Sequence, residues 1–339
     1  METLTHTAAF LLDWHVILAA LIGVTWGIMG GALPGISPSI TMALLLPFTY
    51  TLDPTSAIVL LASTYIGAEY GGSVPAILIR TPGTNAAAAT VIDGYEMNRQ
   101  GKAGLALGIS LYSGVIGSLF GLAMLMTLSG PLAQVALAFT PMAYFALGVL
   151  GLSVIATLSG ENLVKGLIAA ILGLIIATIG SDPVTGGTRF TFGSPELLGG
   201  IEPVMIMVGL FAMSELLVQA GKRGQDERVT SRPRIQFPDW PLAKRLIPAQ
   251  LIGNGIGTVE GVMPGAGGTI ASFMSYNEAR RWSRYPEEFG KGSPEGIAAP
   301  ETANNTVAET ALVPLLSFGI PGSNSTAILL GGFLIHGIV

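Results

Sequence analysis

Two stretches of this chain carry the same run of residue types, and those types could bind an anion. Residues 74–89 read VPAILIRTPGTNAAAA and residues 313–328 read VPLLSFGIPGSNSTAI, so a Pro-Gly-[Thr/Ser]-Asn turn occurs at residues 82–85 and again at residues 321–324. Proline removes a helical hydrogen-bond donor, and glycine permits dihedral angles that other residues avoid. The hydroxyl and carboxamide that follow can cap a new helix, whose free N–H groups carry about half a positive charge and suit an anion.

The two turns supply one set of candidate substrate-binding residues. A helix that starts at membrane depth would direct its amides, a hydroxyl and a carboxamide at one point, and each turn has a second proline seven residues earlier. Ordinary N-capping in an interfacial loop is the alternative interpretation. The residues that we expect to contact the substrate or a coupling ion are Gly83, Thr84, Asn85, Gly322, Ser323, Asn324, Ser325 and Thr326.

A second pair of helix-breaking clusters lies upstream of these turns. Residues 31–40 read GALPGISPSI and residues 261–270 read GVMPGAGGTI. Unwound carbonyls at such breaks could hold a cation such as Na⁺, although a tight turn between two helices would use the same residues. Four breaks arranged as two repeats in an apolar chain are typical of a transporter built from broken membrane helices. The cation candidates in these clusters are Pro34, Gly35, Ser37, Gly265 and Gly267.

Acidic residues inside apolar stretches are the remaining candidates for the cation site or the cavity. Carboxylates within a membrane are costly, so a functional interpretation is the default for them. Glu301 shares a helical face with two asparagines by its i, i+3, i+4 spacing, although a structural or capping role remains open for it, as it does for Glu260. The candidates of this kind are Glu69, Glu301, Asn304, Asn305 and Glu309.

The composition indicates a membrane protein. Half of the 339 residues are hydrophobic, 11% are charged and the mean hydropathy is +0.63, which is too apolar for a soluble protein of this length. The chain has no cysteine, which excludes disulfides and thiolate chemistry. The N-terminus lacks the basic start of a cleavable signal, so its first apolar run is expected to remain as a helix. The runs long enough to cross a bilayer are residues 16–31, 104–128, 132–158, 163–179 and 201–220.

The placement of Lys and Arg predicts the orientation. Residues 222–245 hold the richest basic segment together with three prolines, which indicates an extended cytoplasmic loop. Arg99 and Lys102 mark an earlier cytoplasmic turn, and no Lys or Arg precedes Arg80. An N-terminus outside the cell would then start the first repeat outside and the second inside.

We therefore expect an all-α, polytopic membrane protein with broken or re-entrant helices in two inverted repeats. Residues 1–102 would form repeat one, with its broken-helix transport elements. Residues 103–245 would be connecting transmembrane helices and the basic loop, and residues 246–339 the start of repeat two. Because the repeat period is about 230 residues, the second repeat is expected to be truncated.

Long motifs resemble a known family. GALPGISPSITMALLLPFTY, YIGAEYGGSVPAILIRTPGTNAAAATVIDGYEMNRQ and PETANNTVAETALVPLLSFGIPGSNSTAILLGG are similar to the large permease subunit, the TctA family, of tripartite tricarboxylate transporters. The resemblance implies uptake of a carboxylate anion, such as citrate or a related dicarboxylate or aromatic carboxylate, with Na⁺ as coupling ion. It also implies a multi-pass protein of the bacterial inner membrane. The implied partners are a small four-helix membrane subunit and a periplasmic solute-binding protein.

Two other functions are weaker alternatives. An anion channel could also use broken helices. An intramembrane hydrolase would need a Ser–His pair or two embedded aspartates, but the aspartates, Asp93 included, are expected in loops or at interfaces, and no serine stands beside the histidines in sequence. There is no nucleotide-binding Walker motif. We expect no enzyme activity, no cofactor and no nucleic-acid partner.

Overall fold

The computed structural model describes residues 13–33, 36–137, 163–181, 187–201, 233–263 and 267–338, with a few single positions between residues 140 and 217. Within these residues the fold is all-α except for one short strand pair, in which Gly180 pairs with Arg189. The helices are α2 (Trp14–Gly31), α3 (Pro38–Thr49), α4 (Pro54–Ile79), α5 (Ala88–Arg99), α6 (Ala103–Leu137), α8 (Leu163–Ala177), α11 (Trp240–Val262), α12 (Gly267–Trp282), α13 (Pro294–Thr310), α14 (Leu312–Phe318) and α15 (Asn324–Ile335). The short elements are β1 (Gly180–Ser181), β2 (Thr188–Arg189), η1 (Pro195–Gly199) and η3 (Pro286–Glu288).

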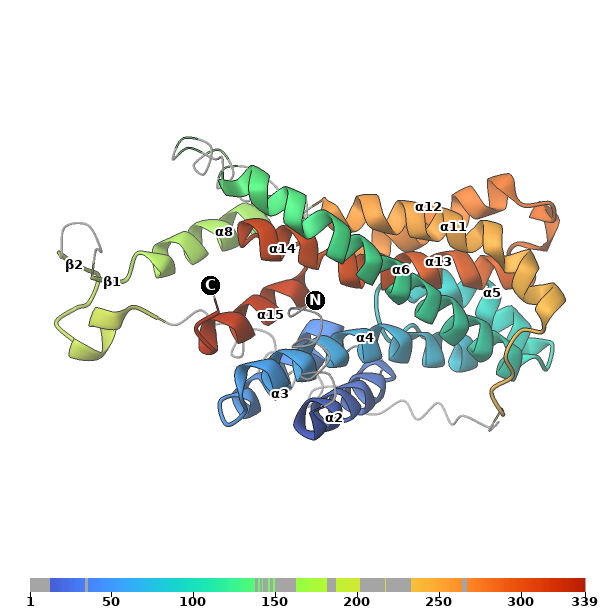
Figure 1. Cartoon of the computed structure of the whole chain (residues 1–339), viewed down its shortest axis with the longest axis horizontal. Helices are drawn as coiled ribbons and strands as arrows, with labels where there is room; N and C mark the ends of the chain where they lie inside the picture. Colours follow the sequence, from blue (N-terminus) through green and yellow to red (C-terminus); the bar gives the residue numbers. More distant parts are fainter. Residues whose placement is uncertain are drawn as a thin grey trace.

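Two groups of helices follow the same order. Helices α2, α3, α4 and α5 are matched by α11, α12, the α13–α14 pair and α15. Helices α4 and α13 lie side by side and antiparallel. Two contacts show this: Glu69 pairs with Asn304, whereas Ser73, further along α4, pairs with Glu301, which comes earlier in α13. Helices α5 and α15 extend toward opposite ends of the molecule, α5 to the right and α15 to the left in Figure 1.

Glycines at every fourth position hold the first helix of each group against the third. A Cβ at Gly27 of α2 would lie 2.3 Å from the carbonyl oxygen of Thr64 in α4, and a Cβ at Gly257 of α11 would lie 2.6 Å from that of Ala303 in α13. Only small residues allow backbones to approach this closely. The full series are Gly23, Gly27 and Gly31 in α2, and Gly253, Gly257 and Gly261 in α11.

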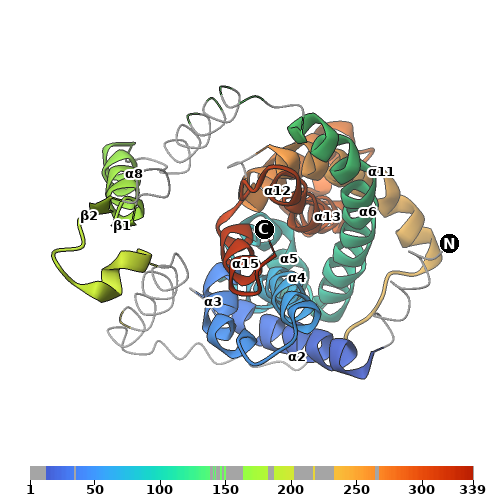
Figure 2. The same cartoon turned by 60° about the vertical axis from the view of Figure 1, so that its left-hand side comes forward.

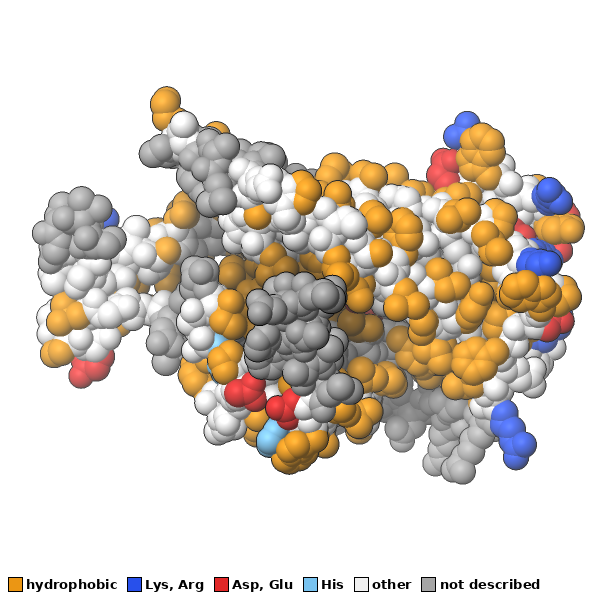
Figure 3. Space-filling model, viewed as in Figure 1, with side chains coloured by type: hydrophobic (Ala, Val, Ile, Leu, Met, Phe, Trp, Pro, Cys, Tyr) orange, Lys and Arg blue, Asp and Glu red, His pale blue; other side chains and the backbone are white. Residues whose placement is uncertain are grey.

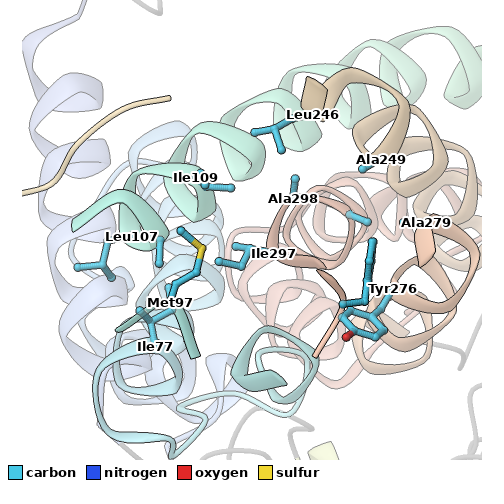
Figure 4. Close-up of a cluster of buried hydrophobic side chains, with 13 residues drawn as sticks. Ile77, Met97, Leu107, Ile109, Leu246, Ala249, Tyr276, Ala279, Ile297 and Ala298 are labelled. Carbon is cyan, nitrogen blue, oxygen red and sulfur yellow. The ribbon is translucent and has the colours of Figure 1, made fainter. Parts of the chain in front are cut away.

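Helix α13 is the centre of the molecule although its sequence is polar. Every residue from 295 to 310 is buried. Ile297 and Ala298 at its start belong to a buried apolar cluster to which α4, α5, α6, α11 and α12 also contribute (Figure 4). Threonines further along, such as Thr306, donate hydrogen bonds to a carbonyl of α6 and to a side chain of α11. The helix is therefore held by hydrogen bonds as well as by apolar packing.

Two predicted boundaries are wrong. The gap expected between the spans 104–128 and 132–158 is absent, because α6 runs through Pro131 to Leu137; the proline removes one N–H from the helix without ending it. The end of the expected loop 222–245 is helical instead, because α11 starts at Trp240. Asp239 caps this start, and Pro241 occupies the first turn, where a proline needs no hydrogen-bond donor.

Two described helices are long and apolar enough to cross a membrane, namely residues 14–31 and 103–134. Helix α8 is shorter and equally apolar, and it stands apart from the main bundle in Figure 2. Much of the predicted span 132–158, and all of span 201–220 except residues 201 and 217, lie outside the described residues. Lys and Arg side chains gather at one end of the main bundle, on the right in Figure 3, where α11 starts and α12 ends.

Candidate functional site

The first Pro-Gly turn folds back against two helices of its own repeat. Helix α4 ends at Arg80, whose φ of 61° is left-handed, and the amide of Thr81 donates to the carbonyl of Pro75 at 3.3 Å. The Gly83 amide then donates to the Gly72 carbonyl of α4 at 3.0 Å. A Cβ at Gly83 would lie 1.9 Å from the carbonyl oxygen of Gly31, at the end of α2, so only glycine fits there.

The second turn has the same backbone path. Helix α14 ends at Gly319, with φ 68°, and the amide of Ile320 donates to the carbonyl of Pro314 at 3.3 Å. A Cβ at Gly322 would meet Ala311 at 3.3 Å and the carbonyl oxygen of Gly261 at 3.4 Å. The neighbours of Gly322 thus correspond in sequence to those of Gly83, but the space around it is wider.

Helices start after both turns, as the sequence predicts, but their capping differs. Ser323 caps α15 directly: its hydroxyl accepts from the amide of Thr326, and the Thr326 hydroxyl accepts from the amide of Ser323. In the first turn Thr84 accepts from the amide of Ala87 at 3.3 Å, and α5 begins only at Ala88, two residues later than the alanine run predicts. The hydroxyls of Ser323 and Thr326 are therefore engaged with backbone groups.

The two asparagines of the turns are exposed, whereas Thr84 and Ser325 beside them are buried and Ser323 is half-buried. Asn85 and Asn324 occupy equivalent positions and both side chains are exposed. Thr84 is 4% exposed and Ser325 6%. At each turn, the carboxamide is the side chain most available to a solute.

Glu301 lies where the two repeats meet. Its carboxylate is 2% exposed and accepts hydrogen bonds from three hydroxyls on three helices of the first half of the chain. The donors are Ser73 of α4 at 2.6 Å, Thr90 of α5 and Ser110 of α6 at 3.0 Å. A buried charge needs such donors to offset its lost hydration, so Glu301 ties α13 to the helix that follows the first turn.

Asn304 connects a second carboxylate to the same region. Its amide donates to Glu69 at 2.9 Å. Its carbonyl oxygen faces the start of α12, since a Cβ at Gly268 would lie 2.2 Å from that oxygen and 3.5 Å from the methyl of Ala86 in the first turn. Glu69, Asn304 and the first turn are therefore neighbours.

Glu309 is the carboxylate with the fewest partners. It is 8% exposed, and among the described residues no hydrogen bond to its oxygens is found. Tyr65 lies near both Glu69 and Glu309, and its hydroxyl lies near Ser323 and Ser325 at the second turn. Tyr65 thus joins the acidic residues to the second turn.

Asn305 lies on the side of α13 that faces α6. Its amide donates to the carbonyl of Glu301 in its own helix at 2.9 Å, and its side chain packs against Gly114 of α6. It lines a cavity of about 190 Å³ with Tyr70 and Ser118. Asn305 and Glu301 therefore both face α6, since Ser110 of α6 donates to Glu301, whereas Asn304 faces Glu69 of α4.

The upstream clusters are described only in part. Ser37 caps α3 by accepting from the amide of Ile40 at 3.3 Å, and Gly267, with φ 67°, begins α12. Pro34, Gly35 and Gly265 lie outside the described residues. Within the described part of the chain, no group of His, Cys, Asp and Glu side chains is arranged to hold a tightly bound metal ion.

Sequence reasoning missed several residues that complete this region. Asp93 does not lie in a loop: it lies in α5, is fully buried, and accepts from the amides of Gly290, Gly292 and Ser293, each at 2.8 Å. The Tyr276 hydroxyl donates to its other oxygen. The hydroxyl donors to Glu301 were also missed, since isolated Ser and Thr residues give no signal in a single sequence.

Comparisons with known proteins show the family of the chain. Residues 17–339 match the family described as "Tripartite tricarboxylate transporter TctA family". The chain belongs to this family. TctA proteins are membrane components of transporters and are not an enzyme family, so the chain is located in a membrane.

Two proteins of Agrobacterium vitis are similar to this TctA-family chain. One, described as an uncharacterized 52.8 kDa protein in the TAR-I ttuC' 3' region, is 41% identical over 326 residues, which cover 95% of this chain and 64% of that protein. Another, described as an uncharacterized protein in the TAR-II ttuC' 3' region, is 46% identical over 82 residues, 24% of this chain and 34% of that protein. The chain spans less than two thirds of the length of either relative. No solved structure matches it significantly.

Proposed function

We propose that this TctA-family chain is the permease subunit of a secondary carrier that imports a carboxylate anion with a cation. The substrate would be a tricarboxylate such as citrate, or a related dicarboxylate or aromatic carboxylate. The observation that carries the proposal is the pair of equivalent Pro-Gly turns, each with an exposed asparagine, which is the first residue of α15 in the second turn and lies three residues before α5 in the first. Helix-start amides and carboxamides suit the oxygens of a carboxylate.

Inverted repeats are part of this proposal. The opposite directions of α4 and α13, and the extension of α5 and α15 toward opposite ends of the molecule, support a pseudo-two-fold relation between the repeats. With a multi-pass topology in the inner membrane, residues 1–102 and the segment from residue 246 would approach the site as re-entrant halves. Transporters of this design bind substrate where the two halves meet.

Cation coupling follows from the charge of the substrate. Moving an anion into a negative interior is opposed by about 2.3 kcal/mol per charge per 100 mV, and the chain has no nucleotide-binding motif. We place the coupling cation, Na⁺, near Glu69 and Glu309, because these carboxylates flank Tyr65 beside the second turn. High-affinity capture would come from a periplasmic solute-binding protein, and a small four-helix membrane subunit would complete the carrier.

Uptake in proteoliposomes tests the proposal. The full-length subunit and its small partner would be reconstituted, and uptake of labelled citrate, a dicarboxylate and an aromatic acid measured while the Na⁺ gradient and the binding protein are varied independently. Saturable uptake that requires the gradient is expected for one of these acids. Concentrative uptake that persists without gradient and binding protein would overturn the mechanism, and non-saturating flux would indicate a channel.

A further inference from the structure

A cavity of about 500 Å³ lies at the basic end of the molecule, away from the two turns. It is formed by the first turns of α11, the end of α12 and the loop that follows. Its lining holds three cations, Lys244, Arg245 and Arg284, and one carboxylate, Glu295; with Glu288, which also pairs with Arg245, the excess is one positive charge (3 − 2). An opening with this balance favours an anionic group.

Two of the three cations are available to a ligand. Arg245 is engaged, since it pairs with Glu295 at 2.9 Å and also with Glu288. Lys244 and Arg284 are exposed and form no ion pair within the described residues. The Lys244 ammonium lies only over the ring of Trp240, 5.0 Å from its centroid.

The basic cavity continues into an apolar groove. A second hollow of about 420 Å³ lies between α11 and α12, and it shares Ile252 and Trp282 with the basic cavity. The groove is lined mainly by apolar side chains of the two helices, together with Glu278 beside Trp282 and Glu260 at the far end. Glu278 is engaged, because it accepts from the Trp282 indole at 3.1 Å and pairs with Arg281.

The aromatic side chains mark the depth of this site in the membrane. Trp282, which lines the cavity, and Trp240, beside Lys244, are 71% and 73% exposed, as expected of residues at the level of lipid headgroups. A ligand that fills both spaces must have an anionic head at this level and an apolar tail that runs toward the membrane interior. A small hydrophilic anion would leave the groove empty, and a neutral lipid would leave the two cations without a counter-charge.

We propose that this cavity and groove bind an anionic diacyl phospholipid. Lys244 and Arg284 contact the headgroup phosphate, and one acyl chain lies along Leu251, Gly255 and Ile256 between α11 and α12. Basic pockets between membrane helices are suited to such headgroups. The site is separate from the substrate turns and does not depend on the transport mechanism.

Native mass spectrometry of the detergent-purified full-length subunit with its small partner tests this site. The complex is exposed to equal amounts of phosphatidylglycerol and phosphatidylcholine, and retention of phosphatidylglycerol is expected to be about tenfold greater. The double variant Lys244→Glu/Arg284→Glu should lose this preference. The matched control Lys102→Glu/Lys291→Glu, which reverses two exposed charges outside both cavities, should keep it.

A variant in the groove distinguishes binding of a lipid from binding of free phosphate. A Cβ at Gly255 meets no atom within 4 Å, so Gly255→Phe should fill the groove without disturbing the fold, and it should reduce retention of phosphatidylglycerol about tenfold. Equal retention of the two lipids by the unmodified complex would overturn the proposal. So would displacement of phosphatidylglycerol by millimolar inorganic phosphate combined with full retention by Gly255→Phe, since the site would then recognise phosphate alone.

Discussion

The two Pro-Gly turns share one backbone and differ in their side chains. Each follows a helix that ends in a left-handed residue, with the same hydrogen bond back to a proline, at Pro75 and at Pro314. Each glycine packs near the end of the first helix of its repeat. The left-handed residue, however, is Arg80 in the first turn and a glycine in the second. The first turn uses a single hydroxyl bond, and the second a complete capping box.

The two turns share a backbone conformation, but different side chains surround them. The shared backbone places an exposed asparagine at the same point of each repeat, whereas the surroundings assign different partners to each turn. The first turn lies beside Asn304 and the carboxylate of Glu69, and the second beside Tyr65 and the carboxylate of Glu309. We infer that the two turns have equivalent geometry and unequal roles.

The largest expected effect comes from the unequal space around the two glycines. Gly83→Ala would bring a methyl to 1.9 Å from a backbone oxygen, so the turn must shift and uptake should be abolished. Gly322→Ala makes contacts of 3.3 Å with a methyl group and should retain much of the uptake. Uptake in proteoliposomes, normalised to the inserted protein, measures both. Equal loss in the two variants would contradict the proposed asymmetry.

Glu301 and Glu309 are expected to contribute unequally to the free energy of unfolding. Glu301→Ala leaves three buried hydroxyls without their acceptor and should lower the free energy of unfolding by about 3 kcal/mol. Glu309→Ala removes a carboxylate that has no hydrogen bond among the described residues, so it should cost less than about 1 kcal/mol while removing Na⁺ dependence of uptake. Thermal unfolding in detergent compares the two. A stability loss at Glu309 as large as that at Glu301 would show that it is structural.

Loss of a helix cap should lower the free energy of unfolding by a smaller amount. Ser323→Ala removes the cap of α15 and half of its capping box, and it should destabilise the protein by about 1 kcal/mol. Thr84→Ala removes one hydrogen bond of 3.3 Å ahead of α5 and should cost about 0.5 kcal/mol. Chemical unfolding of the two variants against the unmodified protein provides the comparison. The reverse order would contradict the different capping of the two turns.

Replacing Arg80 should change the free energy of unfolding by an amount similar to that of the caps, but with the opposite sign. A non-glycine residue in the left-handed region costs about 1 kcal/mol, so Arg80→Gly should stabilise the protein by about that amount. Gly319→Ala, at the equivalent position, should destabilise it by a similar amount. Unfolding midpoints of this matched pair are expected to move in opposite directions. Destabilisation by Arg80→Gly would mean that the arginine side chain contributes more than its backbone costs.

The sequence predicted both turns because these depend on local chemistry. Proline and glycine act where they stand, so the helix start at Asn324 and the close packing of Gly83 follow from residues nearby. The glycine series in α2 and α11 is also visible in the sequence, at a spacing of four residues, but only the structure shows what the glycines contact. The continuous course of α6 through Pro131 was not predictable, since a proline can end or merely weaken a membrane helix.

The interior of the site could not be predicted from one sequence. The donors to Glu301 come from positions 191 to 228 residues away, and the amides that surround Asp93 from positions about 200 residues away. Such contacts depend on how α13 is surrounded by the helices of the first repeat, and no local pattern encodes that. The same packing turned Asn305 away from Glu69 and toward α6.

Substrate protection of both turns tests the central claim most directly. Residues 1–339 contain no cysteine, so Asn85→Cys and Asn324→Cys each introduce a single thiol into this part of the subunit, and any cysteine elsewhere in the full-length subunit or its partner is first replaced by serine. In proteoliposomes that hold the full-length subunit and its partner, both thiols should react with a small maleimide. The transported carboxylate with Na⁺ should slow both reactions, while Phe48→Cys, an exposed position on α3, should react unchanged. Protection at only one of the two turns, or at neither, would contradict a single site shared by the two repeats.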